Sequence, residues 1–355
     1  MAQSSPKREY HKNRPKQILI SLALLAVLLV LAIYSLSINS FEVSMQEALD
    51  AIINRIKGIE PVGYIAGMID YVVIDVNSPR TIAAILVGTT LAVSGTVMQT
   101  LTHNPLAEPY TIGISSAALF GATLCIALGV SVIPGVGKDI ALCANSFIFA
   151  MVPALVIVSA SSLKKLSPNM MILLGIGMMY VFSASTTFLK FNTSEEKLQE
   201  IYIWGVGTLT KIQWEDVIPL LVGCVLLIVV FTAMSRKINV LMAGDKVCQS
   251  LGENPNKIRL ISFTLISLGV AIVVCYTGTI GFVGLVAPHL TRLFVGNNNR
   301  PLIPLSALSG SLLILVSDVV VRSLPGGLPC GVVTALIGSP MFLYFLFKQR
   351  KKSTF

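Results

Sequence analysis

Long apolar runs alternate with short polar segments along most of the chain. The runs cover residues 18–38, 80–102, 111–130, 140–161, 170–190, 216–235, 260–277, 280–295, 302–322 and 329–347. A helix needs about 20 mainly apolar residues to cross the hydrocarbon core of a bilayer, so the pattern predicts about ten spans. The run 280–295 is the weakest, because it is short and ends with His289 and Arg292, and we expect it to be tilted or to cross only in part.

The composition places the chain in a membrane. Of 355 residues, 54% are hydrophobic and 12% are charged, and the mean hydropathy is +0.80. A soluble domain carries about 25% charged residues, so this chain lacks the charge to cover a water-facing surface. We predict an all-α integral membrane protein folded as one compact bundle. The six cysteines are scattered without a CxxC or Cys/His pair, so no metal site is expected.

The positive charges predict the orientation. Five Lys and Arg residues lie within residues 1–17, and four lie within 348–355. The basic start imitates a signal peptide, but no clear A-x-A site follows its long apolar run, so an uncleaved first span is expected. With the N-terminus inside, 18 of the 26 Lys and Arg residues face the cytoplasm. This bias predicts two cytoplasmic tails, 1–17 and 348–355, around a single transmembrane domain, 18–347.

Two segments outside the membrane are long enough to form structure and to bind partners. Residues 39–79 are expected outside and contain an amphipathic pattern from Met45 to Ile56. Residues 236–259 are expected inside. The net charge of +9 follows from the orientation, since basic residues gather at the cytoplasmic ends of the spans, and nucleic-acid binding is therefore not expected.

Ionisable side chains are scarce in the predicted spans, which argues against an enzyme or a proton-driven carrier. Asp318 is the only carboxylate well inside a span, and it lies four residues before Arg322 on the same helical face. We interpret the two as a structural ion pair, with a proton relay as the alternative. The chain has no Walker A sequence, so any ATP must be hydrolysed by a partner. Glycines recur along the predicted spans and allow helices to pack closely.

Several strings together resemble, in order and spacing, the permease subunits of ABC importers for cobalamin, haem and ferric siderophores, the FecCD type. The strings are Pro79-Arg80 with Gly88 to Gln99, Asn104 to Pro109 with Gly113 to Gly121, Gly244-Asp245 with Leu251-Gly252, Gly278 to Arg292, Asp318 with Arg322, and Leu328-Pro329 to Pro340. The resemblance runs from about residue 17 to 347. It implies a ten-helix permease that works as a pair, with two cytoplasmic ATPases and an extracytoplasmic substrate-binding protein. ATP and Mg²⁺ would bind the ATPases, and this chain would hold no cofactor.

The resemblance also implies a coupling segment that docks on the ATPase. Its residues here are Leu241, Gly244, Asp245, Lys246, Leu251 and Gly252. Short helices broken at Gly252 and Pro255 suit a rigid polar docking surface. The alternative is an ordinary charged loop.

On the outer face, Arg80 and Arg322 resemble arginines that meet acidic residues of the binding protein. Charge pairs at a transient interface steer docking. Alternatively, both arginines lie at the membrane interface, or Arg322 pairs with Asp318. The sequence departs from the cobalamin permeases at Asn77, where an arginine is expected, so docking through Arg55 or Lys57 is a further alternative.

The translocation path implied by the resemblance is lined mainly by the fifth span. Its candidate residues are Met170, Met171, Met178 and Ser183, and the candidate cytoplasmic gate is formed by Asn104 and Leu106 in one loop and Pro168 and Asn169 in another. Methionine side chains are flexible and hydroxyl groups are uncharged, so a path lined by them would bind a large chelate weakly and release it. Core packing is the alternative for each of them.

The sequence thus predicts a multi-pass permease subunit of an ATP-driven importer in a bacterial cell membrane, carrying a ferric siderophore. Haem and cobalamin are the alternative cargoes. Two other classes stay open: a secondary carrier driven by an ion gradient, which would need a carboxylate at the membrane midplane, and a membrane scaffold without transport.

Overall fold

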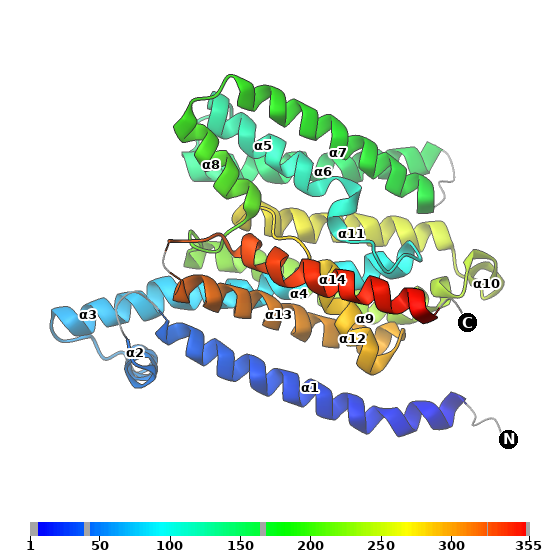
Figure 1. Ribbon diagram of the computed structural model, residues 1–355, viewed down its shortest axis with the longest axis horizontal. Helices are drawn as coiled ribbons and strands as arrows, with labels where there is room; N and C mark the ends of the chain where they lie inside the picture. Colours follow the sequence, from blue (N-terminus) through cyan, green and yellow to red (C-terminus); the bar gives the residue numbers. More distant parts are fainter. Residues whose placement is uncertain (1–5, 39–42, 164–167, 325, 353–355) are drawn as a thin grey trace.

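The computed structural model describes residues 6–38, 43–163, 168–324 and 326–352, and this part of the chain is helical without a strand. The ten predicted runs correspond to α1 (Pro6–Ser37), α4 (Ser78–Leu101), α5 (Ile114–Leu128), α6 (Lys138–Leu163), α7 (Pro168–Phe191), α9 (Trp214–Met242), α11 (Pro255–Thr277), α12 (Val283–Val295), α13 (Asn299–Ser323) and α14 (Cys330–Lys352) (Figure 1). This confirms the predicted fold class.

Two of the ten helices are short. The helix α5 has 15 residues and α12 has 13. A helix of 13 residues is only about 20 Å long. The helix α12 therefore cannot cross a hydrocarbon core of about 30 Å alone, in keeping with the weak signal of its sequence. It begins after Phe282, whose backbone is in the left-handed region (φ 68°) and turns the chain sharply from α11.

Six shorter elements connect the spans: α2 (Met45–Lys57), α3 (Tyr64–Asp70), η1 (Tyr71–Asn77), η2 (Pro109–Ile112), α8 (Glu195–Val206) and α10 (Asp245–Ser250). The amphipathic pattern from Met45 forms α2. The side chain of Ser44 accepts a hydrogen bond from the backbone N–H of Glu47, and the carboxylate of Glu47 accepts one from the backbone N–H of Ser44. The two bonds form a capping box. The sequence analysis missed α8, although Ser194, Glu195 and Glu196 are typical of a helix start.

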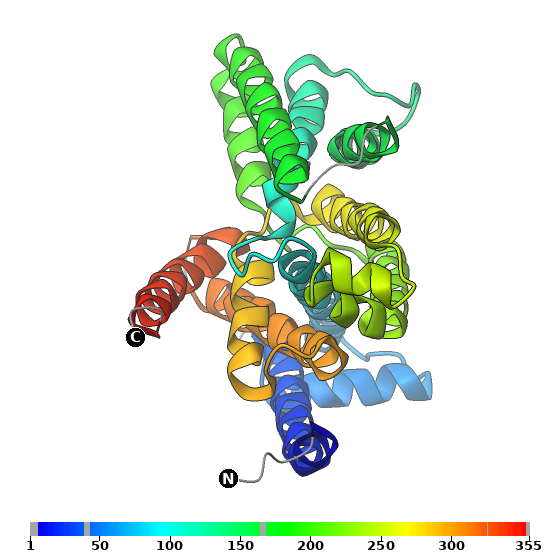
Figure 2. The same cartoon turned by 90° about the vertical axis from the view of Figure 1, so that its right-hand side faces the viewer.

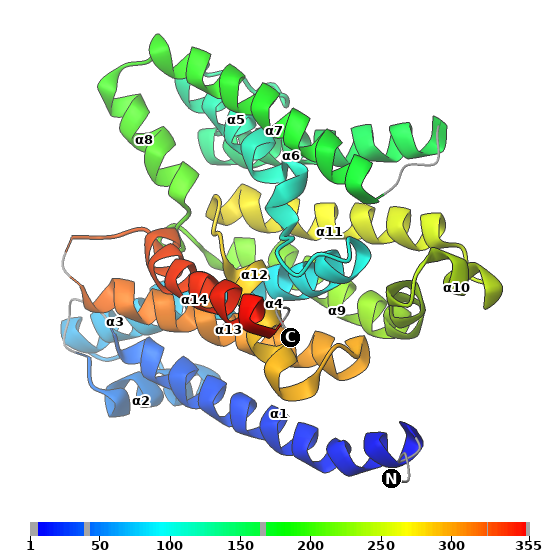
Figure 3. The same cartoon turned by 45° about the vertical axis from the view of Figure 1, so that its right-hand side comes forward.

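The start of α1, the end of α14 and α10 lie at one end of the bundle, and α2, α3 and α8 lie at the other (Figures 1 and 3). This arrangement fits an even number of spans with both termini in the cytoplasm. The helix α1 begins at Pro6, well before its apolar run, because the basic residues that precede the run are good helix formers. Viewed along the bundle, α7 and α8 stand apart from α1, α12 and α13 (Figure 2).

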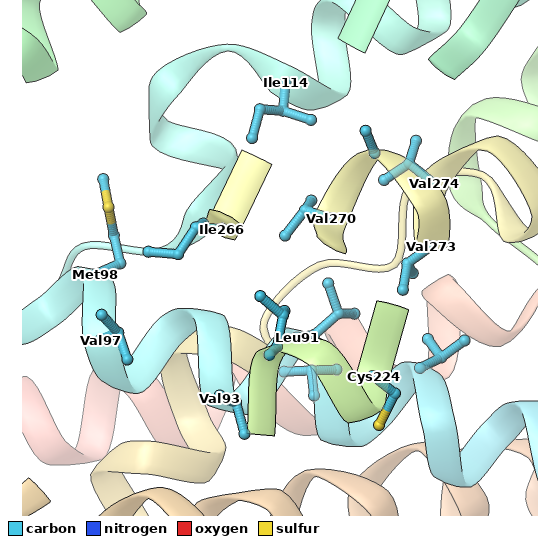
Figure 4. Packing of buried hydrophobic residues seen from close by; sticks show 14 of the residues in the cluster. Leu91, Val93, Val97, Met98, Ile114, Cys224, Ile266, Val270, Val273 and Val274 are labelled. Carbon is cyan, nitrogen blue, oxygen red and sulfur yellow. The ribbon is translucent and has the colours of Figure 1, made fainter. Parts of the chain in front are cut away.

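The helix α4 is the centre of the bundle. Nearly all of its residues are buried, and it packs against α13, α9, α12 and α11. Leu91, Val93, Val97 and Met98 of α4 belong to one apolar cluster with residues of α9 and α11 (Figure 4). The cluster partners labelled there are Cys224, Ile266, Val270, Val273 and Val274.

Paired glycines let α4 approach two neighbours closely. Gly88 lies against Gly310 of α13, and Gly95 lies against Gly284 of α12. A Cβ atom built on Gly95 would overlap the carbonyl group of Gly284, which belongs to a backbone that cannot move aside alone. Close backbone approach replaces the hydrophobic force that lipid does not supply between helices.

We expect Gly95→Ala to push α12 away from α4 and to destabilise the folded chain by several kcal/mol, as overpacking of a fixed backbone contact does. Thermal unfolding in mild detergent measures the effect. Gly177→Ala in α7 is the matched control, because a Cβ there meets no atom within 4 Å. Equal unfolding temperatures for both variants would contradict the close contact.

Candidate functional site

The predicted coupling segment 236–259 is divided between the end of α9, the short helix α10 and the start of α11. Gly244 (φ 105°) precedes α10 and Gly252 (φ 79°) follows it, so both turns use backbone conformations that favour glycine. Pro255 then opens α11 at a position where its missing N–H costs nothing. The sequence therefore produces a compact helix–turn–helix at the cytoplasmic end.

Every residue of α10 except Cys248 is exposed, including Lys246 and Val247, and Leu251 directly after the helix is 63% exposed. Cys248 points the other way and is fully buried, which anchors α10 to the bundle. Leu241 lies in the last turn of α9 and is fully buried, so its side chain packs inside the bundle beneath the segment; its part in coupling stays a prediction.

Asp245 binds Arg259 of α11 through two hydrogen bonds. The Nη2–Oδ1 distance is 2.6 Å and the Nη1–Oδ2 distance is 2.8 Å, a fork-like geometry that only arginine provides. The hydrogen bonds from Arg259 lower the pKa of Asp245, so the pair is ionised in the cytoplasm. The sequence analysis missed this partner because a helix and two turns separate the residues, and no local spacing indicates the contact.

A second charge cluster lies at the outer ends of α4 and α13. Asp318 is fully buried and accepts hydrogen bonds from Arg80 (Nε–Oδ1, 2.8 Å) and from Arg322 (Nε–Oδ2, 2.7 Å). Arg322 also donates to the carbonyl oxygen of Ser35 in α1 and to the side chain of Asn77. The predicted ion pair of Asp318 with Arg322 is confirmed, and Arg80 completes it from a distant part of the chain.

The docking of Arg80 and Arg322 on a binding protein stays a prediction; in the folded chain both side chains are largely buried and pair with Asp318. Asn77, where an arginine was expected, is also buried and accepts a bond from Arg322. Arg55 is half exposed on the outer side, 3.7 Å from Asp70 and 3.8 Å from Asp75. It and Lys57 are the basic residues of α2 that stay open to solvent.

The candidate path residues of α7 do not share one face. Met170 is 50% exposed and Ser183 is exposed, whereas Met178 packs near Gly113 of the neighbouring loop. Met171 is fully buried in this chain, and the assignment of these residues to the path stays a prediction. The exposed face of α7 instead includes apolar and aromatic side chains that were not predicted, namely Leu173, Tyr180, Val181 and Phe188.

The candidate gate residues lie at the cytoplasmic ends of α4 and α7. Asn104 accepts a hydrogen bond from the backbone of Leu106, which makes a tight turn, and Leu106 is partly exposed. Pro168 is the first residue of α7, and its side chain lies outside the described residues; Asn169 beside it is exposed. The loop after α4 reaches α7 through Gly113, which is in close contact with Gly175.

Glu108 lies in the same loop, between α4 and η2. Burial raises the pKa of its carboxyl group to about 7, and a backbone hydrogen bond from Phe282 opposes that shift. The carboxyl therefore titrates near physiological pH beside the turn that opens α12. Glu108 lies in the string Asn104 to Pro109 that resembles the permease family, but nothing in the sequence indicates that its carboxyl group is buried.

This geometry describes a helical membrane protein with a short exposed helix, α10, at its cytoplasmic end and an exposed face of α7 whose described side chains are mostly uncharged. The chain matches the FecCD transport family over residues 27–348, and it belongs to that family. It is 31% identical to the Fe(3+)-citrate import system permease protein YfmE of Bacillus subtilis, over 96% of this chain and 98% of that protein. It is 32% identical to the molybdate import system permease protein MolB of Haemophilus influenzae, over 94% and 96%.

The chain is also 35% identical to the cobalamin import system permease protein BtuC of Halobacterium salinarum, over 76% of this chain and 72% of that protein. Its fold is similar to a solved metal-chelate type ABC transporter in an inward-facing conformation, with a TM-score of 0.80, 31% identity and coverage of 93% and 99%. The chain is therefore an ABC importer permease, a multi-pass protein of the cell membrane that is not itself an enzyme.

We expect Asp318→Asn to destabilise the folded chain by about 3–5 kcal/mol, because two buried arginines lose the carboxylate that binds them both. The unfolding temperature in detergent and the yield of monodisperse protein measure the loss. Asp139→Asn, at an exposed position near the same membrane face, is the control. Unchanged stability of the Asp318 variant would show that the buried cluster is not needed for folding.

Glu108 generates a pH prediction. A carboxyl pKa that rises from 4.5 to about 7 on folding means that the folded chain loses stability as the pH rises through this window. Glu108→Gln removes the titration, so we expect the variant to be more stable than the wild type at pH 8, by at most about 3 kcal/mol, and no more stable at pH 4. Thermal unfolding at both pH values tests this, with the exposed Glu60→Gln as control. An equal difference at both pH values would refute the assignment.

Proposed function

We propose that this permease carries a ferric siderophore. The observation that carries the proposal is the exposed face of α7, which crosses the membrane with methionine, aromatic and hydroxyl side chains. The charged residue of α7 is Lys190, near its outer end, and its ammonium group lies 4.4 Å from the ring centre of Tyr202. Such a face binds a bulky chelate weakly, as a release path requires.

The uncharged face favours a large chelate over a small oxyanion. Molybdate, the cargo named for one relative, would be held best by cationic or N–H donors, which this face of α7 does not present. Hemin and cobalamin, the cargoes named for two other relatives, are larger ligands whose outer surfaces include apolar parts, and a further relative is named for ferric citrate. Among these, a ferric siderophore remains our choice, and haem and cobalamin are the alternatives.

In the proposed mechanism, two permeases enclose a central path that opens alternately to either side of the membrane. Two partner ATPases bind ATP and Mg²⁺, and their closure moves α10 of each permease. A binding protein delivers the chelate to the outer face. The second permease is either a copy of this chain or a related chain.

The competing class, a carrier driven by an ion gradient, needs a carboxylate that is free to bind a proton or a cation inside the membrane. Asp318 is committed to Arg80 and Arg322 in the folded chain, which supports ATP as the energy source instead.

Uptake by the reconstituted complex tests the proposal. The full complex, with its ATPase and binding protein, is placed in proteoliposomes with ⁵⁵Fe-labelled ferric hydroxamate outside. We expect saturable uptake that needs internal ATP and that Ser183→Trp reduces to near background. Val225→Trp, at an exposed position of α9, is the matched control and should transport normally.

Each other result has a definite meaning. Uptake of haem, cobalamin or molybdate in preference to every ferric siderophore would replace the cargo. Uptake that an uncoupler abolishes and that ATP depletion leaves unchanged would replace the class. Full transport by the Ser183→Trp complex would remove α7 from the path.

A further inference from the structure

The coupling helix α10 is attached to α11 by a buried charge. Arg259 has a side chain that is only 2% exposed and is among the largest fully buried residues of the described chain, while its partner Asp245 is 46% exposed. The arginine thus reaches from inside the bundle to the first residue of α10. Because the guanidinium is buried, separating the two would leave a buried charge without its counter-ion, which is unfavourable.

A second ion pair on the same segment differs in its surroundings. Lys237 of α9 lies 3.1 Å from Glu253, but both side chains are partly exposed, with 54% and 31% of their surface accessible. Pairs of this kind contribute little, because water and salt screen them. Asp245 therefore ties α10 to α11 through a buried guanidinium, whereas the exposed pair joins α9 to Glu253 in the turn between α10 and α11.

The other end of α11 is also fixed. The carbonyl oxygen of Thr277 accepts a hydrogen bond from the backbone N–H of Thr208 (2.7 Å), and Thr279 donates to the carbonyl oxygen of Gly205 at the end of α8. Gly207 in turn accepts a bond from Gly331 in the first turn of α14 (3.1 Å). We call this contact of α8, α11 and α14 the outer junction.

Between its two ends, α11 is a continuous helix. Its 23 residues hold a proline only in the first turn, whereas α6, α9, α12, α13 and α14 each contain an internal proline. An unbroken helix of this length is a rod of about 35 Å. A movement imposed on one end therefore reaches the other with little bending.

We propose that the Asp245–Arg259 pair is a latch that makes α10 and α11 move as one body, so that α11 delivers the movement of the coupling helix to the outer junction. The inference rests on the proposed function as an ATP-driven permease, whatever its cargo. Asp245 is then a positioning residue that acts within the permease, in contrast to its neighbour Lys246, which is exposed for the ATPase. The latch extends the coupling path from the cytoplasmic end along α11 to the outer junction.

The test measures transport and ATP hydrolysis together in the reconstituted complex. For Asp245→Asn we expect ATP hydrolysis to continue while the number of substrate molecules transported per ATP falls at least about fivefold, since the loss removes a coupling interaction. Asp245→Glu, which keeps the charge, should restore much of the ratio. Lys138→Gln, which breaks the exposed Lys138–Glu200 pair outside the coupling segment, is the matched control and should keep the wild-type ratio.

The double variant Asp245→Asn/Arg259→Met covers the case in which a lone buried arginine prevents folding. It removes both charges, so the complex should assemble, yet the ratio should stay low because the latch is gone. A wild-type ratio in the double variant, or in Asp245→Asn, would overturn the proposal. A wild-type complex that transports nothing with ATP would instead overturn the proposed function, so the two failures can be told apart.

Discussion

The seam between α4 and α13 is the contact on which the rest of the bundle depends. It begins at the outer end with Arg80 and Asp318, continues through the touching backbones of Gly88 and Gly310, and ends with the Thr100–Asn299 hydrogen bond (3.2 Å). Lipid offers no hydrophobic force to join helices, so glycine contact and polar bonds must supply the attraction. The helices α9, α11 and α12 pack around α4, which this seam fixes against α13.

Two charge clusters show how such a protein uses its few ionisable residues. The outer cluster neutralises buried arginines and joins α1, α4 and α13, and the cytoplasmic pair joins α10 to α11. Neither lies on the exposed face of α7. The charges thus hold helices together at the two ends of the bundle, and the face proposed for the cargo remains uncharged.

Most of the helices could be predicted from the sequence, because each apolar run is itself the signal of a span. Tertiary contacts could not be predicted in the same way. The pairing of Asp318 with Arg322 follows from their helical spacing, but Arg80 joins them across 238 positions of sequence, and no local pattern indicates that contact. Likewise, the sequence does not distinguish the neighbouring methionines of α7, whereas in the folded chain Met171 is buried and Met170 is exposed.

The short helix α12 has a consequence for how the chain can vary. Gly284 lies against Gly95 in the interior of α4, so the turn from Gly278 to Phe282 sits at the depth of the acyl chains. Its backbone groups cannot face lipid and must stay enclosed by protein or water. Insertions and deletions should therefore accumulate among homologues in the surface connections 58–63 and 129–137, while the length of this inner turn stays constant.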